Sequence, residues 1–175
     1  MADPILTIRP IEGHGLATIM ARRGVEPVAI GKALGVAVPQ GPRSLHANGR
    51  RLTGMGPGAW LLMEERAGPG WATEIAQGLA GLASVTDQSS GYALLEISGP
   101  GARAVLQKGL AIDLHPDAFP AGHAATSVIE HIGVILWCIE TSLFHVATFR
   151  SYARDFRHWL DMTAQSIEGA QEKAA

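Results

Sequence analysis

Residues 86–109, TDQSSGYALLEISGPGARAVLQKG, decide the fold of this chain. The stretch from 92 to 98 is rich in β-forming and apolar residues, which predicts a strand. A Gly-Pro-Gly turn follows, with Gly99 as the expected helix N-cap and Pro100 at the first helical position. Four residues then recur at the i, i+3, i+4, i+7 spacing of one helix face: Ala102, Val105, Leu106 and Gly109. The segment therefore predicts a strand, a tight turn and a helix.

The second half of the chain continues this pattern. Three further strands are expected at 125–129, 134–139 and 143–148, followed by a helix over 151–163. The middle strand is apolar on both faces, so we expect it in the interior of its sheet. The order β-α-β-β-β-α predicts an α+β fold of ferredoxin-like β-α-β units, with an antiparallel or mixed sheet and helices packed on one face.

The first half predicts shorter elements. They are an edge strand at 5–8, a helix over 16–23, a helix ending at 35, a loop over 39–50, strands at 59–63 and 84–86, and a helix beginning at 71 between those two strands. From these patterns we divide the chain into an N-terminal arm with a short helix (1–29), a main domain (30–165) and a polar C-terminal tail (166–175) that we expect to fray.

Composition narrows the function classes. The chain has 175 residues, 47% of them apolar, and a formal net charge of −2. The basic pairs Arg22-Arg23 and Arg50-Arg51 are too short to follow a phosphate backbone, and we expect them on solvated faces. Nucleic acid is therefore not an expected partner.

The single cysteine and the N-terminal residues bear on location. Cys138 is the only cysteine, so no internal disulfide is possible, and its apolar surroundings predict a buried packing residue. The first fifteen residues contain no apolar signal-peptide core, and no run approaches the roughly 20 apolar residues of a membrane span. We expect a cytoplasmic protein with no membrane association.

Three patterns that could suggest a catalytic, phosphate or metal site are better explained structurally. The turn at 99–101 lacks the Lys and Ser/Thr of a phosphate loop, and Pro100 removes one donor. A turn with side-chain-to-backbone hydrogen bonds explains Asp87, Ser89 and Ser90 better than a nucleophile does. The seven histidines show neither helical i, i+4 pairing nor a completing ligand, so we expect no metal site: His14, His46, His115, His123, His131, His145 and His158.

Three residues are candidates for a partner interface. Trp60 lies on a short apolar run after a flexible loop, and large aromatic side chains concentrate binding energy at interfaces. Core packing is the alternative for this residue. Arg150 and Tyr152 begin the last helix. Arg150 would contact a partner or a cofactor phosphate, with a surface ion pair as the alternative.

Four blocks of sequence carry a resemblance to a known family. They are AIGKALGVAVPQGP (29–42), GPGAWLLM (56–63), VTDQSSGYALLEISGPGARAVLQKGLAIDLHPDAFPAG (85–122) and FRSYARDFRHWL (149–160). In order and spacing, the chain resembles the γ subunit of heterotetrameric sarcosine oxidases. More distantly, it resembles the folate-binding aminomethyltransferase domains of the glycine-cleavage system.

This resemblance implies a non-catalytic subunit of a cytoplasmic flavoenzyme complex with α, β and δ partner subunits. The complex demethylates sarcosine to glycine and releases hydrogen peroxide, and tetrahydrofolate captures the one-carbon unit as methylene-tetrahydrofolate. The resemblance implies that FAD, FMN, NAD and zinc are held by the partner subunits and that this chain binds no cofactor. It also implies an apolar partner-facing surface, so we expect the isolated chain to self-associate.

The chain departs from the aminomethyltransferases where their chemistry takes place. The family's strand matching 133–139 carries adjacent carboxylates, whereas this chain has Val134, Ile135, Leu136 and Trp137. The family's acidic pair before the tryptophan is replaced by Gly58-Ala59. Without a carboxylate to organise proton transfer, independent aminomethyl transfer is not expected.

Two alternatives remain. A stand-alone folate-binding, one-carbon transfer protein would have to recruit Glu96, Asp113 or Glu130. An iron–sulfur maintenance factor of the same fold group would need a cysteine in a KGC-type motif, but Lys108-Gly109 is followed here by Leu110.

Overall fold

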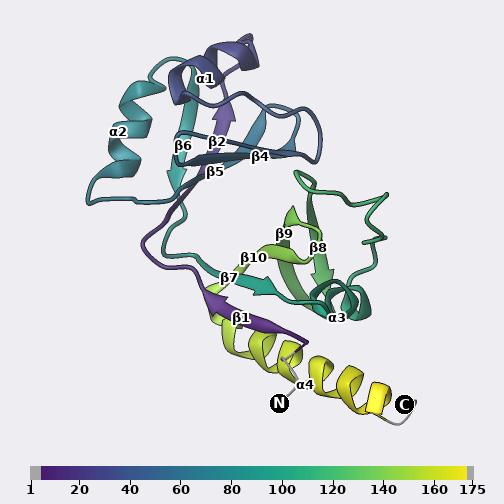
Figure 1. The fold of residues 1–175 in the computed structure, drawn as a ribbon. Helices are drawn as coiled ribbons and strands as arrows, with labels where there is room; N and C mark the ends of the chain where they lie inside the picture. The colour runs from purple at the N-terminus through teal and green to yellow at the C-terminus, as the bar shows by residue number, and fades with distance from the viewer. Residues whose placement is uncertain (1–4, 173–175) are drawn as a thin grey trace. The chain divides into compact units, whose positions relative to one another are not determined.

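The chain forms two compact units, each built on one five-stranded sheet (Figure 1). The terminal unit comprises Met1–Ile11 and Ala93–Ala175, and the middle unit comprises Glu12–Tyr92. This computed structural model describes residues 5–172.

The terminal unit carries the sheet β1-β7-β10-β9-β8. Its elements are β1 (Thr7–Pro10), β7 (Tyr92–Ser98), α3 (Ala102–Gly109), β8 (Ala124–Ile129), β9 (Ile132–Glu140), β10 (Leu143–Phe149), a 3₁₀ turn η1 (Arg150–Tyr152) and α4 (Ala153–Glu172). The strand pairs β1–β7, β9–β10 and β8–β9 are antiparallel. The predicted order β-α-β-β-β-α is confirmed, and β9 lies inside the sheet as expected.

Both helices of the terminal unit pack on one face of its sheet. Alternate residues of β9 point to this face, namely Val134, Leu136 and Cys138, and they share a core cluster with Leu106 of α3 and Phe156 of α4. The apolar side chains on this face of β9 therefore pack against the apolar faces of α3 and α4. The burial of these side chains is the main stabilising contribution in this unit.

The middle unit carries the sheet β3-β4-β5-β2-β6. Its elements are β2 (Gly15–Ala21), α1 (Pro27–Leu34), β3 (Ser44–Ala47), β4 (Arg50–Gly56), β5 (Ala59–Glu64), α2 (Trp71–Gly78) and β6 (Ala83–Asp87). A second core cluster joins Ile30 of α1 and Ile75 of α2 to the sheet residues Ile19, Leu52 and Leu62.

The strand-turn-helix unit is confirmed as β7 and α3, but the helix begins two residues later than expected. Its N-cap is Gly101, not Gly99. Gly99 has φ +119°, and a Cβ there would lie 2.6 Å from the Ile5 carbonyl oxygen. The Gly101 N–H donates to that carbonyl at 2.8 Å. The turn 99–101 therefore packs against the backbone of Ile5, just before β1, and helix α3 begins only after this contact.

Three local predictions are wrong. Residues 15–21 form the interior strand β2 instead of part of a helix over 16–23, because they pair with both β5 and β6. The predicted loop at 39–50 contains the strand β3 and the hairpin turn into β4. Helix α4 continues to Glu172, so residues 166–172 are helical, and Ile167 packs against the core.

The α+β class is confirmed, but the strands form two antiparallel five-stranded sheets instead of one. Among residues 5–172, no helix is both long and apolar enough to span a membrane.

Candidate partner interface

The β8–β9 turn, residues 130–131, organises an exposed apolar surface on the terminal unit. Val128 pairs with Gly133 across the hairpin. Thr148 pairs with Val134, so Phe149 follows opposite Gly133 on the third strand. Val128 and Phe149 are 50% and 49% exposed, and a Cβ at Gly133 would meet nothing within 4 Å. Two apolar side chains thus flank an open position.

Tyr152 lies against the same turn. The chain leaves β10 at Phe149 and makes the 3₁₀ turn η1, which presents Arg150 and Tyr152 on the surface. The Tyr152 ring meets the His131 ring edge to face, with centroids 6.2 Å apart and planes at 77°. The structure therefore brings two of the three predicted interface residues together beside this turn.

Helix α4 adds a fourth exposed apolar side chain. Met162, 53% exposed, lines a shallow groove together with Glu130 of the turn and Lys108 at the end of α3. We call the set Val128, His131, Phe149, Tyr152 and Met162 the turn surface; Val128 and Phe149 point away from the helix face of the sheet and Met162 lies on α4, so the set borders the β8–β9 turn from both faces of the sheet. It contains all four large apolar side chains that are exposed in the described part of the terminal unit.

Trp60, the third candidate, lies in the middle unit and is not exposed. It sits in β5 opposite Ile19, is 4% exposed and belongs to the core cluster. It also lines a groove of about 960 Å³ beside α1, where Val28 is 76% exposed. The structure therefore places Trp60 with the core, the alternative left open by the sequence.

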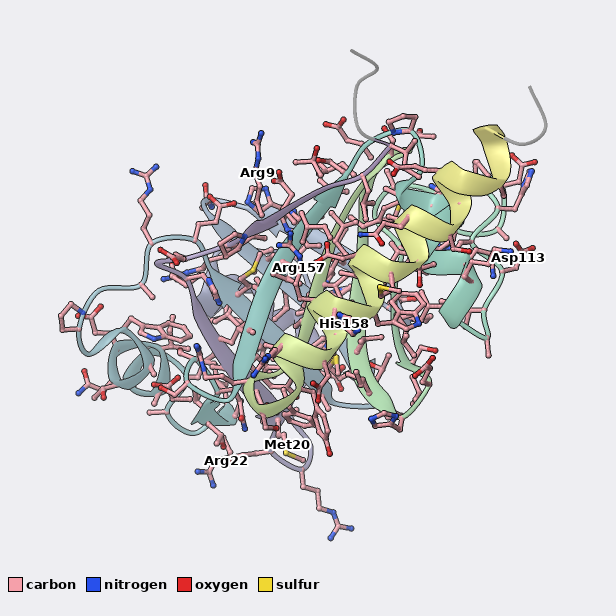
Figure 2. The ribbon with its side chains drawn as sticks, turned by 90° about the horizontal axis from the view of Figure 1, so that it is seen from below. Arg9, Met20, Arg22, Asp113, Arg157 and His158 are labelled. Carbon is pink, nitrogen blue, oxygen red and sulfur yellow. The ribbon has the colours of Figure 1, made fainter. Side chains whose placement is uncertain are left out.

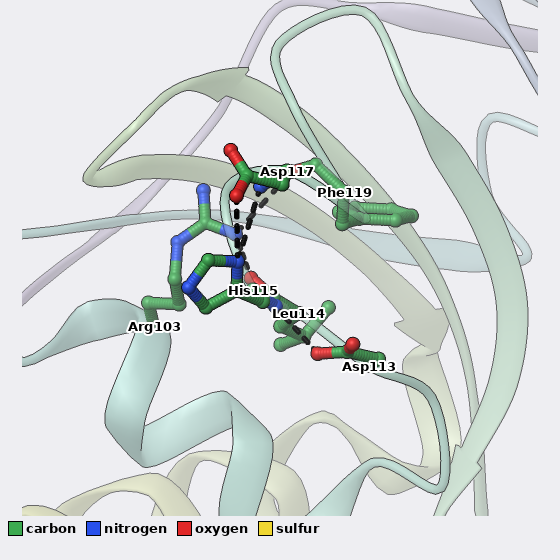
Figure 3. Close-up of polar contacts among 6 residues, drawn as sticks. All are labelled: Arg103, Asp113, Leu114, His115, Asp117 and Phe119. Atoms are coloured by element: carbon green, nitrogen blue, oxygen red, sulfur yellow. Dashed lines mark hydrogen bonds and ion pairs between the residues drawn. The ribbon is translucent and has the colours of Figure 1, made fainter.

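Sequence reasoning missed Arg103, which anchors the loop 110–123 (Figure 3). Its guanidinium donates to the carbonyl oxygens of Leu114, Phe119 and Thr141. It also stands over the Phe144 ring, 4.9 Å from the centroid. The available signal was an arginine near a helix start with no acidic residue three or four positions away to pair with it.

Arg103 also contacts the buried cysteine. Its Nη2 lies 3.6 Å from Cys138 Sγ. Burial raises the pKa of the Cys138 thiol, and the charge and hydrogen bond of Arg103 partly offset that rise. The expectation of a buried packing cysteine is confirmed.

The polar group before β7 is a turn, as expected. Asp87 Oδ1 accepts hydrogen bonds from the Ser89 N–H at 2.9 Å and the Ser89 hydroxyl at 2.6 Å. The Ser89 hydroxyl oxygen also accepts from the Leu16 N–H at 3.1 Å. The Ser89 side chain therefore links the turn after β6 to the backbone of β2.

The histidines do not converge. His115 pairs with exposed Asp117 in the loop 110–123, and the Asp113 carboxylate accepts from the His115 N–H (Figure 3). Across the described residues, no group of three or more His, Cys, Asp or Glu side chains could hold a metal ion.

The two basic pairs differ in environment. Arg22 and Arg23 are exposed as expected, and Arg22 extends away from the ribbon (Figure 2). Arg50 and Arg51 are half-buried in β4, so the prediction of a solvated face is wrong for them. Arg50 Nε donates to Glu64 Oε2 at 2.7 Å, and its Nη1 donates to the Leu34 carbonyl at 2.8 Å.

Arg51 points to the opposite face of the sheet and is poorly satisfied. Its Nη1 makes one long bond of 3.3 Å to the Ser44 hydroxyl, while its Nε is buried without a hydrogen-bond partner. Burial lowers the pKa of the Arg51 guanidinium, and the charge of Glu65 opposes that change.

Sequence comparison gives the family. The profile of the sarcosine oxidase, gamma subunit family matches residues 22–166. Sarcosine oxidase subunit gamma from Arthrobacter sp is 33% identical over 135 residues, which cover 75% of this chain and 66% of that protein. The corresponding subunit from Corynebacterium sp. (strain U-96) is 30% identical over 173 residues, covering 97% and 78%.

Comparison of folds agrees. A chain in the structure of heterotetrameric sarcosine oxidase from Corynebacterium sp. U-96 matches with a TM-score of 0.85 at 25% identity, over 94% of this chain and 87% of that chain. Glycine cleavage system aminomethyltransferase T from Bartonella henselae matches with a TM-score of 0.64 at 16% identity, over 89% and 45%, which relates the folds alone. The resemblance carried by the four sequence blocks is confirmed, and the chain belongs to the sarcosine oxidase gamma subunit family.

Proposed function

We propose that this chain is a non-catalytic subunit of a heterotetrameric sarcosine oxidase, where it packs against larger subunits. The observation that carries the proposal is the fold match over 94% of the chain with a chain of that oxidase, at a TM-score of 0.85.

The strand β9 supports the non-catalytic role. Positions 134–137, where the related aminomethyltransferases carry carboxylates, are all apolar and at most 4% exposed here. The carboxylates that a stand-alone folate enzyme would recruit lie on three different elements: Glu96 on β7, Asp113 in the loop 110–123 and Glu130 in the β8–β9 turn. Proton transfer requires such groups at one point.

In this assembly, the α, β and δ subunits hold FAD, FMN, NAD and zinc, and tetrahydrofolate is a co-substrate. The complex oxidises sarcosine to glycine in the cytoplasm and forms hydrogen peroxide and methylene-tetrahydrofolate. This chain contributes buried surface, and permanent interfaces of this type bury more than about 2,000 Å².

We assign the turn surface to the contact with a larger subunit. Aromatic and methionine side chains are enriched in interfaces, and a few such residues supply most of the binding energy. Phe149 of β10, Tyr152 of η1 and Met162 of α4 provide these side chains. Arg150 is exposed beside them and supplies a charged rim.

Co-expression of the tagged chain with the three other oxidase subunits of its own host tests the assembly. We expect a yellow complex that produces peroxide from sarcosine. A colourless chain that elutes alone contradicts the proposal. Saturable, micromolar binding of tetrahydrofolate to the isolated chain, measured by calorimetry, would favour the stand-alone folate protein instead.

A double variant tests the surface. F149S/M162S should weaken assembly at least tenfold in affinity, with the urea midpoint of the isolated chain unchanged. V28S/M55S removes two exposed apolar side chains from the middle unit and is the matched control. Equal assembly of both double variants would contradict the assignment of the turn surface, even if the wild-type complex forms.

A further inference from the structure

The groove beside α1 in the middle unit is lined by one face of that helix and by the apolar residues 36–39. The helix contributes four positions at the i, i+3, i+4, i+7 spacing of a single face: Val28, Gly31, Lys32 and Gly35. Ile30 and Leu34 are buried in the core cluster of the unit. Helix α1 therefore buries one face in its own unit and lines an open groove with the other.

Val28 is the most exposed large apolar side chain among residues 5–172, at 76%. It stands one helical turn before Gly31, where the groove is lined by backbone because the residue has no side chain. A Cβ at Gly31 would lie 2.9 Å from the Val36 carbonyl oxygen, so the close approach of the following segment requires glycine there. A projecting valine and a position without a side chain thus lie next to each other on one surface.

The same groove carries an acid and a base at opposite ends of α1. Glu26 is at the N-cap and Lys32 is in the last turn. Both side chains are exposed, and neither makes an ion pair in the part of the chain that the structure describes. The Glu26 carboxylate does not cap the helix either. This order of charges suits the helix dipole, and its complement is a helix that runs in the opposite direction with the same order of charges.

We propose that the isolated chain forms a weak symmetric dimer, in which the α1 helices of two copies pack antiparallel across this groove. In a two-fold interface a surface meets itself reversed, so it must be complementary to itself. A two-fold axis at residues 29–30 places Val28 of each copy opposite Gly31 of the other. It also brings Glu26 of each copy within one helical turn of Lys32 in the other.

The charges favour a second copy over other occupants. A reversed copy presents a base to Glu26 and an acid to Lys32, and both contacts occur twice. The helix is only about 12 Å long, so the dimer buries far less than the roughly 1,600 Å² of a standard interface. We therefore expect a reversible dimer with a dissociation constant of about 10 μM to 1 mM.

Sedimentation of the full chain, from about 5 to 500 μM at low salt, measures this dimer. V28S should weaken dimerisation at least tenfold, because it removes the one large apolar side chain that projects from α1. M20S is the matched control, since Met20 is 56% exposed in the same unit and does not line the groove. F149S/M162S should also dimerise like the wild type, because those residues belong to the terminal unit.

Charge reversal tests the antiparallel arrangement. E26K and K32E each place like charges at both symmetric contacts and should weaken the dimer about fivefold or more at low salt. The double variant E26K/K32E restores opposite charges and should dimerise like the wild type. An equimolar mixture of the two single variants should form a mixed dimer for the same reason. Unchanged urea midpoints of all variants verify that each remains folded.

The proposal is overturned if the wild-type chain remains monomeric over this range, or if V28S dimerises as well as M20S. Failure of E26K/K32E to restore the dimer overturns the antiparallel arrangement. Loss of self-association in F149S/M162S but not in V28S would place it at the turn surface. If V28S leaves self-association unchanged but weakens assembly with the oxidase subunits, a larger subunit occupies the groove and the proposal is wrong.

Discussion

The Tyr152 ring stands edge-on against the His131 imidazole, with centroids 6.2 Å apart, and joins the start of α4 to the β8–β9 turn. Edge-to-face aromatic pairs of this kind contribute beyond the area that they bury, typically about 0.5–1.5 kcal/mol. Because Tyr152 remains 39% exposed, a second face of the residue is still available for a partner. One side chain thereby orders the turn surface and belongs to it.

Replacement of Tyr152 separates these two roles. Y152A should lower the free energy of unfolding by no more than about 1.5 kcal/mol, because little area is lost from a half-exposed ring. Its affinity for the other oxidase subunits should fall tenfold or more, as expected for a central aromatic contact. Urea unfolding and co-purification measure the two effects. Y152F keeps the ring and should match the wild type in both; equal assembly of Y152A and Y152F would contradict the assignment.

Arg103 should stabilise the terminal unit more than any surface ion pair does. R103M leaves the carbonyls of Leu114, Phe119 and Thr141 without their donor, and bonds to a charged donor each contribute about 1.5–3 kcal/mol. We expect a loss of roughly 2–5 kcal/mol in urea unfolding, less than the sum of the three bonds, because the bond to the Thr141 carbonyl is exposed and water can replace it. R157M breaks the exposed i, i+4 pair with Asp161 and should cost about 0.5 kcal/mol or less. Similar midpoints for the two variants would contradict the anchoring role.

The sequence predicted the terminal unit better than the middle unit for a physical reason. Strands β8, β9 and β10 pair with their neighbours in sequence and, like helix α3, have clear apolar periods. Strand β2 instead forms its ladders with β5 and β6, which lie roughly 40 to 70 residues further along the chain. Its apolar spacing is compatible with a short helix, and pairing between distant segments overrides such local preferences.

The β3–β4 hairpin could have been predicted from the sequence. Asn48 and Gly49 connect β3 to β4, with φ values of 54° and 73°. An Asn-Gly pair between short strands is the strongest local signal for a two-residue turn. The prediction of a loop over 39–50 included Asn48 and Gly49 and so did not identify them as a hairpin turn. The environment of Arg51 could not have been found, because it depends on the positions of Ser44, His46 and Glu65 after the strands have paired.

Two glycines that each end an eight-residue helix should respond oppositely to alanine. Gly109 closes α3, where a Cβ would lie 2.5 Å from the Trp159 ring and 2.8 Å from Ile129. We expect G109A to cost about 1–3 kcal/mol through overpacking. Gly78 closes α2 with open space around it, so G78A should be neutral or gain up to about 1 kcal/mol. Thermal or urea unfolding compares them, and a G109A variant as stable as G78A would contradict the close packing of α3 on α4.

Cys138 makes the stability of the chain sensitive to alkaline pH. Burial raises the pKa of its thiol in the folded state, so the unfolded chain loses the proton at a lower pH than the folded chain does. The resulting stabilisation is complete below the pKa of the unfolded thiol and disappears as the pH rises toward that of the folded one. Urea midpoints of the wild type should therefore fall more steeply than those of C138A between about pH 8 and pH 10. The native thiol should also react slowly with a thiol reagent until urea exposes it. Parallel pH profiles for the two proteins would show that the thiol titrates alike in both states, and rapid labelling of the native chain would contradict its burial.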